Sequence, residues 1–177
     1  RSSYIGEGAT VTIGGYLRMQ DASIICSGNA TIILADGTDA NIFNGRIKAG
    51  PEGTTLTIKG NTGELEIKDG TSYGAAIGAS DGAACGNIVI EGGIITATGI
   101  QAAGIGASTA ECGNITISGG TVTATGSNTG GAGIGSGSSD EGWCGNITIS
   151  GGTVEATGGS KSAGIGTGED NGCGDIT

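Results

Sequence analysis

Residues 112–126 read Cys112-Gly-Asn-Ile-Thr-Ile-Ser-Gly-Gly-Thr-Val-Thr-Ala-Thr-Gly126, and this pattern occurs four times in the chain. It returns with one change at Cys144–Gly158, more loosely at Cys85–Gly99, and in part at Cys173–Thr177. A second signature, Ile-Gly, lies between the copies at 77–78, 105–106, 134–135 and 165–166. The cysteines are 27, 32 and 29 residues apart. A period that drifts within this range indicates a solenoid whose turns carry loops of variable length.

Each repeat divides into three short strands, because successive side chains of a strand leave its opposite faces. In the first strand, Ile115 and Ile117 point inward. In the second, Val122 and Ala124 do so, and in the third Ile134. We therefore predict an all-β fold, a parallel β-helix with three short strands per turn and about six turns. Handedness is not visible in the sequence, and a right-handed coil is the expectation.

We expect residues 1–177 to form one β-helix segment. Residues 51–177 carry the regular repeats of about 27–32 residues, whereas residues 1–50 read as less regular first turns. Terminal turns of a solenoid are atypical because they must close the stack. Tyr4, Tyr16, Leu17 and Met19 are expected to help close this end, and the chain itself reads as an excerpt from a longer protein.

Composition and charge exclude several classes of protein. The 41 glycines follow no Gly-X-Y period and come with a single proline, so the chain is not collagen-like. Its net charge is −10 and it has no histidine, which disfavours nucleic acid as a partner. No apolar stretch is long enough to cross a membrane, so no membrane insertion is expected.

The repeat, followed by Ala-Gly-Ile-Gly-Ser-Gly at 132–137, resembles the Gly/Thr/Ile-rich parallel β-helix repeats of large surface proteins of Gram-positive gut bacteria. Ala30-Thr-Ile-Ile-Leu34 and Leu56-Thr-Ile58 lie in segments similar to those that precede such repeats. The family is described as adhesin-like or carbohydrate-binding and offers no catalytic motif to transfer. The resemblance implies a secreted or surface-attached bacterial protein whose partners are host or dietary glycans or surface proteins. Oligomeric state is not readable from the sequence.

Two columns of like residues are expected along the coil. The first holds Cys85, Cys112, Cys144 and Cys173, one per turn. Adjacent turns bring such cysteines within reach of a disulfide, but stacked in-register side chains point the same way, so we expect mostly buried thiols. One or two disulfides remain the alternative. The second column holds Asn87, Asn114 and Asn146, whose amides are expected to satisfy backbone groups rather than to carry glycans.

The loops that precede the cysteines suggest a ligand site. They carry carboxylates that could stack into a stripe and bind Ca²⁺ weakly through oxygen ligands, at Asp81, Glu111, Asp140, Glu169 and Asp170. No other cofactor is expected. Trp143 lies in the same loop series, where it could stack on a sugar ring while Asp140 and Glu141 accept its hydroxyl hydrogens. It could equally cover the side of the coil. Tyr73 is a weaker candidate for the same role.

The sequence favours a non-catalytic, extracellular, adhesin-like segment that contacts glycans or serves as a rigid spacer. A polysaccharide-degrading β-helix enzyme is the first alternative, but the repeats lack paired carboxylates, since Glu91 and Glu155 lie on different strands of different turns. Ice binding is the second alternative. It would use the outward threonine array of the repeats: Thr96, Thr98, Thr123, Thr125 and Thr157.

Overall fold

The computed structural model describes residues 1–68, 73–137, 142–168 and 170–177, and every regular element in these ranges is a β-strand. The strands form three parallel sheets of seven, six and six strands. Sheet A contains β1 (Ser3–Ile5), β4 (Ile24–Cys26), β7 (Ile47–Lys48), β10 (Ile77–Gly78), β13 (Ile105–Gly106), β16 (Ile134–Gly135) and β19 (Ile165–Gly166). Sheet B contains β2 (Ala9–Ile13), β5 (Ala30–Leu34), β8 (Thr55–Gly60), β11 (Asn87–Ile90), β14 (Ile115–Ile117) and β17 (Ile147–Ile149). Sheet C contains β3 (Tyr16–Gln20), β6 (Asp39–Phe43), β9 (Glu64–Lys68), β12 (Ile94–Thr98), β15 (Thr121–Thr125) and β18 (Thr153–Thr157).

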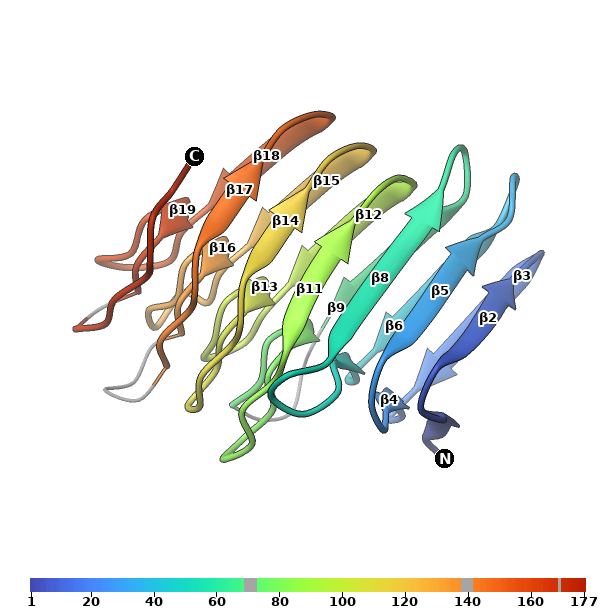
Figure 1. The fold of residues 1–177 in the computed structure, drawn as a ribbon, viewed down its shortest axis with the longest axis horizontal. Coiled ribbons are helices and arrows are strands. Elements are labelled where there is room, and N and C mark those ends of the chain that lie inside the picture. Colours follow the sequence, from blue (N-terminus) through green and yellow to red (C-terminus); the bar gives the residue numbers. More distant parts are fainter. Residues whose placement is uncertain (69–72, 138–141, 169) are drawn as a thin grey trace.

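The chain visits the sheets in the order A, B, C and then returns to A one turn further along, so the predicted parallel β-helix is confirmed. In Figure 1 the chain rises along sheet B at the front and descends along sheet C behind, while it advances from right to left. This sense of winding makes the coil right-handed.

The register follows the repeat signatures. Ile77 pairs with Ile105 and Ile105 with Ile134, although the intervening loops differ in length. Ile47 occupies the same column one turn earlier, as its position 30 residues before Ile77 predicts. The first turns are shorter, since Ser3 pairs with Ile24. Residues 1–50 thus continue the same three sheets despite their irregular sequence.

The core is a set of apolar columns that run along the coil axis. Ile88, Ile115 and Ile147 stack in sheet B and are fully buried. Val122 and Ala124 face the same interior from sheet C. Each buried isoleucine contributes roughly 1.5–3 kcal/mol relative to an exposed one, and most of that comes from neighbouring turns.

The expected closure of the N-terminal end by aromatic side chains is wrong. Tyr4 is 72% exposed and Tyr16 is 65% exposed. Strand alternation explains the difference, because Tyr4 precedes the buried Ile5 and Tyr16 precedes Leu17, which packs against the core. Leu17 and Met19 face the interior at this end, and the two tyrosines face solvent.

Sheet A contains a column of buried glycines. Gly78, Gly106, Gly135 and Gly166 follow the isoleucines of successive turns, with φ between +125° and +137°. A Cβ atom on Gly106 would lie 2.3 Å from the carbonyl oxygen of Gly135. Only glycine combines this backbone conformation with such close stacking.

Candidate functional site

The first three turns place a group of polar and aromatic side chains on the outer face of sheet C. Strand pairing aligns Tyr16 with Asp39, and Asp39 with Glu64. The column two residues further along contains Arg18 and then Asn41 and Glu66. We call these residues the sheet C site: Tyr16, Arg18, Asp39, Asn41, Phe43, Glu64 and Glu66.

A shallow groove of about 290 Å³ lies within the sheet C site. Its polar walls come from Asp39, Asn41, Glu64 and Glu66, and Thr96 lines it from the next turn. The Asn41 amide is buried and donates a hydrogen bond of 2.6 Å to Asp39 Oδ1. Three carboxylates therefore surround a fixed amide on a rigid sheet.

Arg18 supplies the cation of this surface. Its guanidinium carbon lies 5.2 Å from the centre of the Tyr16 ring and 5.6 Å from that of Phe43. Its Nε also donates to the Tyr16 hydroxyl. That hydrogen bond raises the pKa of Arg18, and the charges of Asp39 and Glu66 raise it further. The arrangement orients two aromatic rings beside the acidic groove.

The sequence did not predict this site. Most of its residues lie in the less regular first turns, and Asp39 and Glu64 are 25 residues apart with no repeated signature to mark their register. The available signal was the alternation of Glu64–Lys68, which places Glu64 and Glu66 on the outer face of the strand.

Further along sheet C the outer face carries the predicted threonine array. Thr96 pairs with Thr123, and Thr123 pairs with Glu155, which interrupts the column. The parallel column contains Thr98, Thr125 and Thr157. The chemically varied part of sheet C is thus confined to the first three turns.

The structure does not bring Trp143 and Tyr73 together. Trp143 precedes β17 at the corner between sheets A and B, whereas Tyr73 precedes β10 at the corner between sheets C and A. Trp143 is 50% exposed, and part of its ring lies against Gly172, where a Cβ atom would be 2.3 Å from Cζ3. One side of the indole therefore covers the coil. Asp140 and Glu141, the expected partners of Trp143, lie outside the described residues.

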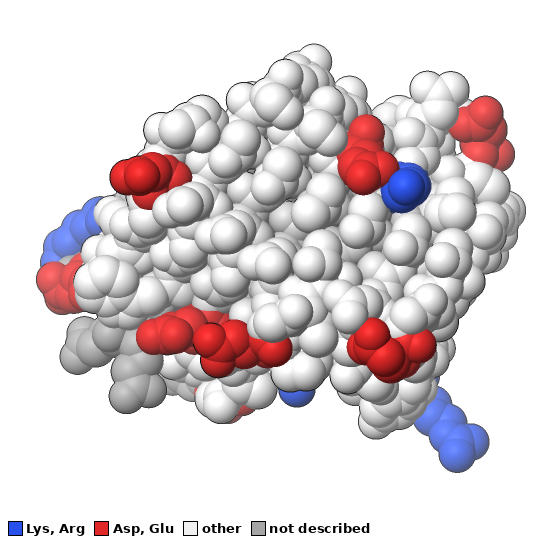
Figure 2. Space-filling model, viewed as in Figure 1, with Lys and Arg blue, Asp and Glu red and all other residues white. Residues whose placement is uncertain are grey.

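The acidic loops follow one edge of the coil. Figure 2 shows acidic side chains gathered along the lower edge of the sheet B face, which is otherwise largely uncharged. Asp81 Oδ1 accepts a hydrogen bond of 3.1 Å from Thr109 of the next turn. Among the described residues, no three His, Cys, Asp or Glu side chains are grouped to hold a metal ion. Since Asp140 and Glu169 lie outside those residues, weak Ca²⁺ binding that also involves Glu111 and Asp170 stays a prediction.

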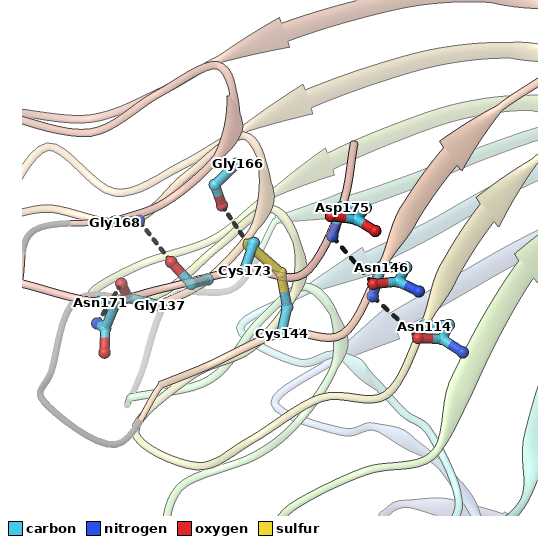
Figure 3. The surroundings of a disulfide bond; sticks show 10 residues. Asn114, Gly137, Cys144, Asn146, Gly166, Gly168, Asn171, Cys173 and Asp175 are labelled. Carbon is cyan, nitrogen blue, oxygen red and sulfur yellow. Dashed lines mark hydrogen bonds between the residues drawn. A yellow bond between two sulfur atoms is a disulfide. The ribbon is translucent and has the colours of Figure 1, made fainter. Parts of the chain in front are cut away.

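The cysteine column runs between sheets A and B. Cys85, Cys112, Cys144 and Cys173 pair in parallel from turn to turn. The expectation of mostly buried thiols holds for Cys85 and Cys112 but is wrong for the last pair, where the alternative of one disulfide applies: Cys144 and Cys173 are bonded, with their Cα atoms 4.7 Å apart (Figure 3). At this pair, in-register stacking places the two sulfur atoms within bonding distance, although stacked side chains were expected to point the same way.

The remaining cysteines are buried thiols: Cys26, Cys85 and Cys112. A hydrogen bond with Cys85 and then burial raise the pKa of the Cys112 thiol well above its usual value. Burial alone raises the pKa of Cys26 to about 11. The Cys26 and Cys112 thiols are therefore protonated and unreactive at neutral pH.

The asparagine column forms a ladder of side-chain to backbone hydrogen bonds. Asn87 Oδ1 accepts from the Asn114 backbone N–H at 2.9 Å, and Asn114 Oδ1 accepts from that of Asn146 at 2.9 Å. Asn146 Oδ1 continues the ladder to Asp175 at 2.9 Å (Figure 3). The side-chain amides thus accept hydrogen bonds from backbone N–H groups where the chain enters sheet B.

A family model described as Beta helix repeat matches residues 88–109, 115–138 and 147–169. Each matched segment begins at the inward isoleucine of a sheet B strand and runs through sheets C and A, so it covers one turn. Three turns of this parallel β-helix therefore resemble the Beta helix repeat model, and the sheet topology of the chain agrees with it. Comparison of this β-helix with curated proteins and with solved structures gave no significant match. The described part of the β-helix contains no helix of the length and apolarity needed to cross a membrane.

Proposed function

We propose that this β-helix is a non-catalytic, extracellular, adhesin-like segment that contacts glycans through the sheet C site. The observation that carries the proposal is the groove of about 290 Å³ beside the exposed Tyr16 ring. The groove offers carboxylate and amide oxygens, and Tyr16 lies on the neighbouring strand of the same face. The contact surface is thus sheet C and not the Trp143 loop.

The chemistry of the sheet C site suits a sugar. The carboxylates of Asp39, Glu64 and Glu66 accept hydrogen bonds from hydroxyl groups. The Tyr16 ring offers an apolar face to the C–H side of a pyranose, and its own hydroxyl is held by Arg18. Preformed polar groups around a concave surface, with an aromatic ring beside them, are typical of small-ligand sites.

The disulfide supports the proposed location. Disulfides persist in oxidising compartments and are rare in the cytosol. Cys144 and Cys173 are joined within the regular repeats, so the bond is part of the coil. Together with the resemblance to bacterial surface repeats, this favours a secreted or surface-attached protein.

A glycan array with two matched variants tests the proposal. Tyr16→Ala removes an exposed ring from the sheet C site, and Trp143→Ala removes an exposed ring from the loop edge. We expect the first variant to lose binding and the second to retain it. The reverse result would move the site to the loop, and a wild-type chain that binds no glycan would instead favour a rigid spacer.

One observation favours hydrolysis as a second candidate function. Asp39, Glu64 and Glu66 lie on two adjacent strands of one face, and glycoside hydrolases use a pair of carboxylates that flank the scissile bond. Release of reducing ends from polysaccharides, measured for the wild type and for Glu64→Gln and Glu66→Gln, would reveal turnover. If the wild type releases reducing ends and both variants do not, the protein is a hydrolase and the non-catalytic proposal is wrong. If all three proteins release reducing ends only at the background rate, hydrolysis is excluded.

A further inference from the structure

A second groove, of about 390 Å³, lies at the corner where the chain passes from sheet C to sheet A. We call it the corner groove. Its polar lining includes Ser2, Ser23, Asn44, Arg46 and Lys48. It is separate from the sheet C site, because its residues come from the corner loops and from the outer side of sheet A.

Two cations meet in the corner groove although the chain as a whole is strongly acidic. Arg46 is only 8% exposed, and its guanidinium lies against Gly74 of the next turn, where a Cβ atom would be 1.5 Å from Nη1. Lys48 follows two residues later, on β7. A guanidinium has five N–H donors, so Arg46 can keep contacts within the protein and still donate to a ligand.

The groove hydroxyls are oriented by the backbone. Ser2 Oγ accepts a hydrogen bond of 3.2 Å from the Ser23 N–H, and Ser23 Oγ accepts one of 3.1 Å from the Arg46 N–H. Each oxygen is used as an acceptor, which leaves its proton for donation to a ligand. Among the described residues that line the groove, the carboxylate is Asp21, which accepts a hydrogen bond of 3.0 Å from the Asn44 amide. The described lining therefore carries two cations and one anion.

An apolar platform leads into the groove. Strand pairing aligns Tyr4 with Ile25, and Ile25 with Lys48, in one outward column of sheet A. Successive strands are about 4.8 Å apart, so the Tyr4 strand and the Lys48 strand are separated by roughly 10 Å. This distance suits a sugar ring that lies on Tyr4 and Ile25 while its charged substituent reaches Lys48 and Arg46.

We propose that the corner groove binds an acidic saccharide, with the carboxylate of a hexuronic acid held by Arg46 and Lys48 and the pyranose ring on Tyr4 and Ile25. The inference rests on the proposed glycan contact and adds a second subsite with a charge preference. The planar guanidinium group of an arginine can donate two parallel hydrogen bonds to a carboxylate. The acidic remainder of the surface is screened beyond about 8 Å at physiological ionic strength, so the local cations determine the contact.

Calorimetric titration with a trigalacturonate and with its methyl ester tests the charge preference. The two probes share the same rings, and the ester replaces each carboxylate charge with a neutral methyl ester. We expect the acid to bind at least about tenfold more tightly than the ester, as a charge-assisted bond implies. Lys48→Gln should remove most of that difference. Lys59→Gln is the matched control, because Lys59 lies on sheet B and is paired with Glu91 at 3.1 Å.

Tyr4→Ala should weaken both probes, since the ring contact does not depend on charge. Equal affinity for acid and ester, or an unchanged preference in Lys48→Gln, would overturn the inference, as would binding of neither probe. Failure of this inference alone leaves the proposed function intact, whereas a wild-type chain that binds neither neutral glycans nor the acidic probe removes both. If neutral glycans bind the wild type and are lost in Tyr16→Ala while the corner groove shows no acid preference, the sheet C site stands alone.

Discussion

Replacement of Gly106 by alanine should destabilise the β-helix far more than the same replacement at Gly82. Both glycines have positive φ, +128° at Gly106 and +63° at Gly82. Alanine in the left-handed α well, where Gly82 lies, costs about 1–2 kcal/mol, and it costs at least as much at Gly106, whose φ lies outside that well. A Cβ atom on Gly82 would meet nothing within 4 Å, whereas on Gly106 it would lie 2.3 Å from the Gly135 carbonyl oxygen. Both variants therefore carry a conformational cost, and only Gly106→Ala adds a steric one.

The steric cost arises because the new methyl group would force apart the adjacent strands that contain Gly106 and Gly135. Gly135 O accepts a hydrogen bond of 2.8 Å from Ala107, and a shift of the carbonyl away from the new methyl group breaks it. A broken backbone hydrogen bond with a buried partner costs about 1–3 kcal/mol. We expect a total loss of about 2–5 kcal/mol for Gly106→Ala and about 1–2 kcal/mol for Gly82→Ala.

Urea denaturation followed by circular dichroism gives both values, provided that the slope of the transition is unchanged. Equal losses at the two positions, within about 0.5 kcal/mol, would refute the argument that stacking requires the glycine column. A large loss at Gly82 alone would show that the corner loop, and not sheet A, limits stability.

Three further predictions concern the ladders and thiols. Asn114→Ala should cost about 1 kcal/mol in urea denaturation, because the Asn146 N–H loses its acceptor, and Asn114→Asp should restore most of this. Replacement of both Cys144 and Cys173 by serine removes a loop constraint of 29 residues and should cost about 3–4 kcal/mol, measured against the wild type under non-reducing conditions. Stability should fall as pH rises from about 9 to about 11, because the folded state holds the Cys26 proton more tightly than the unfolded state, and Cys26→Ala should flatten this part of the pH profile. A steeper fall in that variant would contradict the assignment.

The fold could be predicted because the repeated residues show which positions pair between successive turns. Ile77, Ile105 and Ile134 are each followed by Gly. This repeated pair of residues predicts which strands pair, even where the loops between them differ in length. Strand alternation then separates the buried Ile117 from the outward Thr116. Sequence alone therefore determines the sheets, the core and most outward columns in the regular turns.

The candidate sites could not be predicted in the same way. The sheet C site depends on the pairing of Asp39 with Glu64, which lie in turns without a shared signature. The disulfide depends on the orientation of two sulfur atoms, whereas spacing in the chain shows only that Cys144 and Cys173 are within reach. The Trp143 ring rests on Gly172 of a neighbouring turn, a contact that no local pattern encodes.

The direction of the ladder hydrogen bonds determines how this protein responds to mechanical load. Interstrand bonds lie along the coil axis, so tension between the two ends pulls on successive turns in series, and each turn contacts only its neighbours. Turns then detach one at a time, and a detached turn of about 29 residues extends to roughly 100 Å. The Cys144–Cys173 bond closes a loop of this size, and its residues cannot lengthen while the disulfide is intact. Under tension the disulfide therefore limits the extension of the regular repeats, because the turn that it closes cannot lengthen.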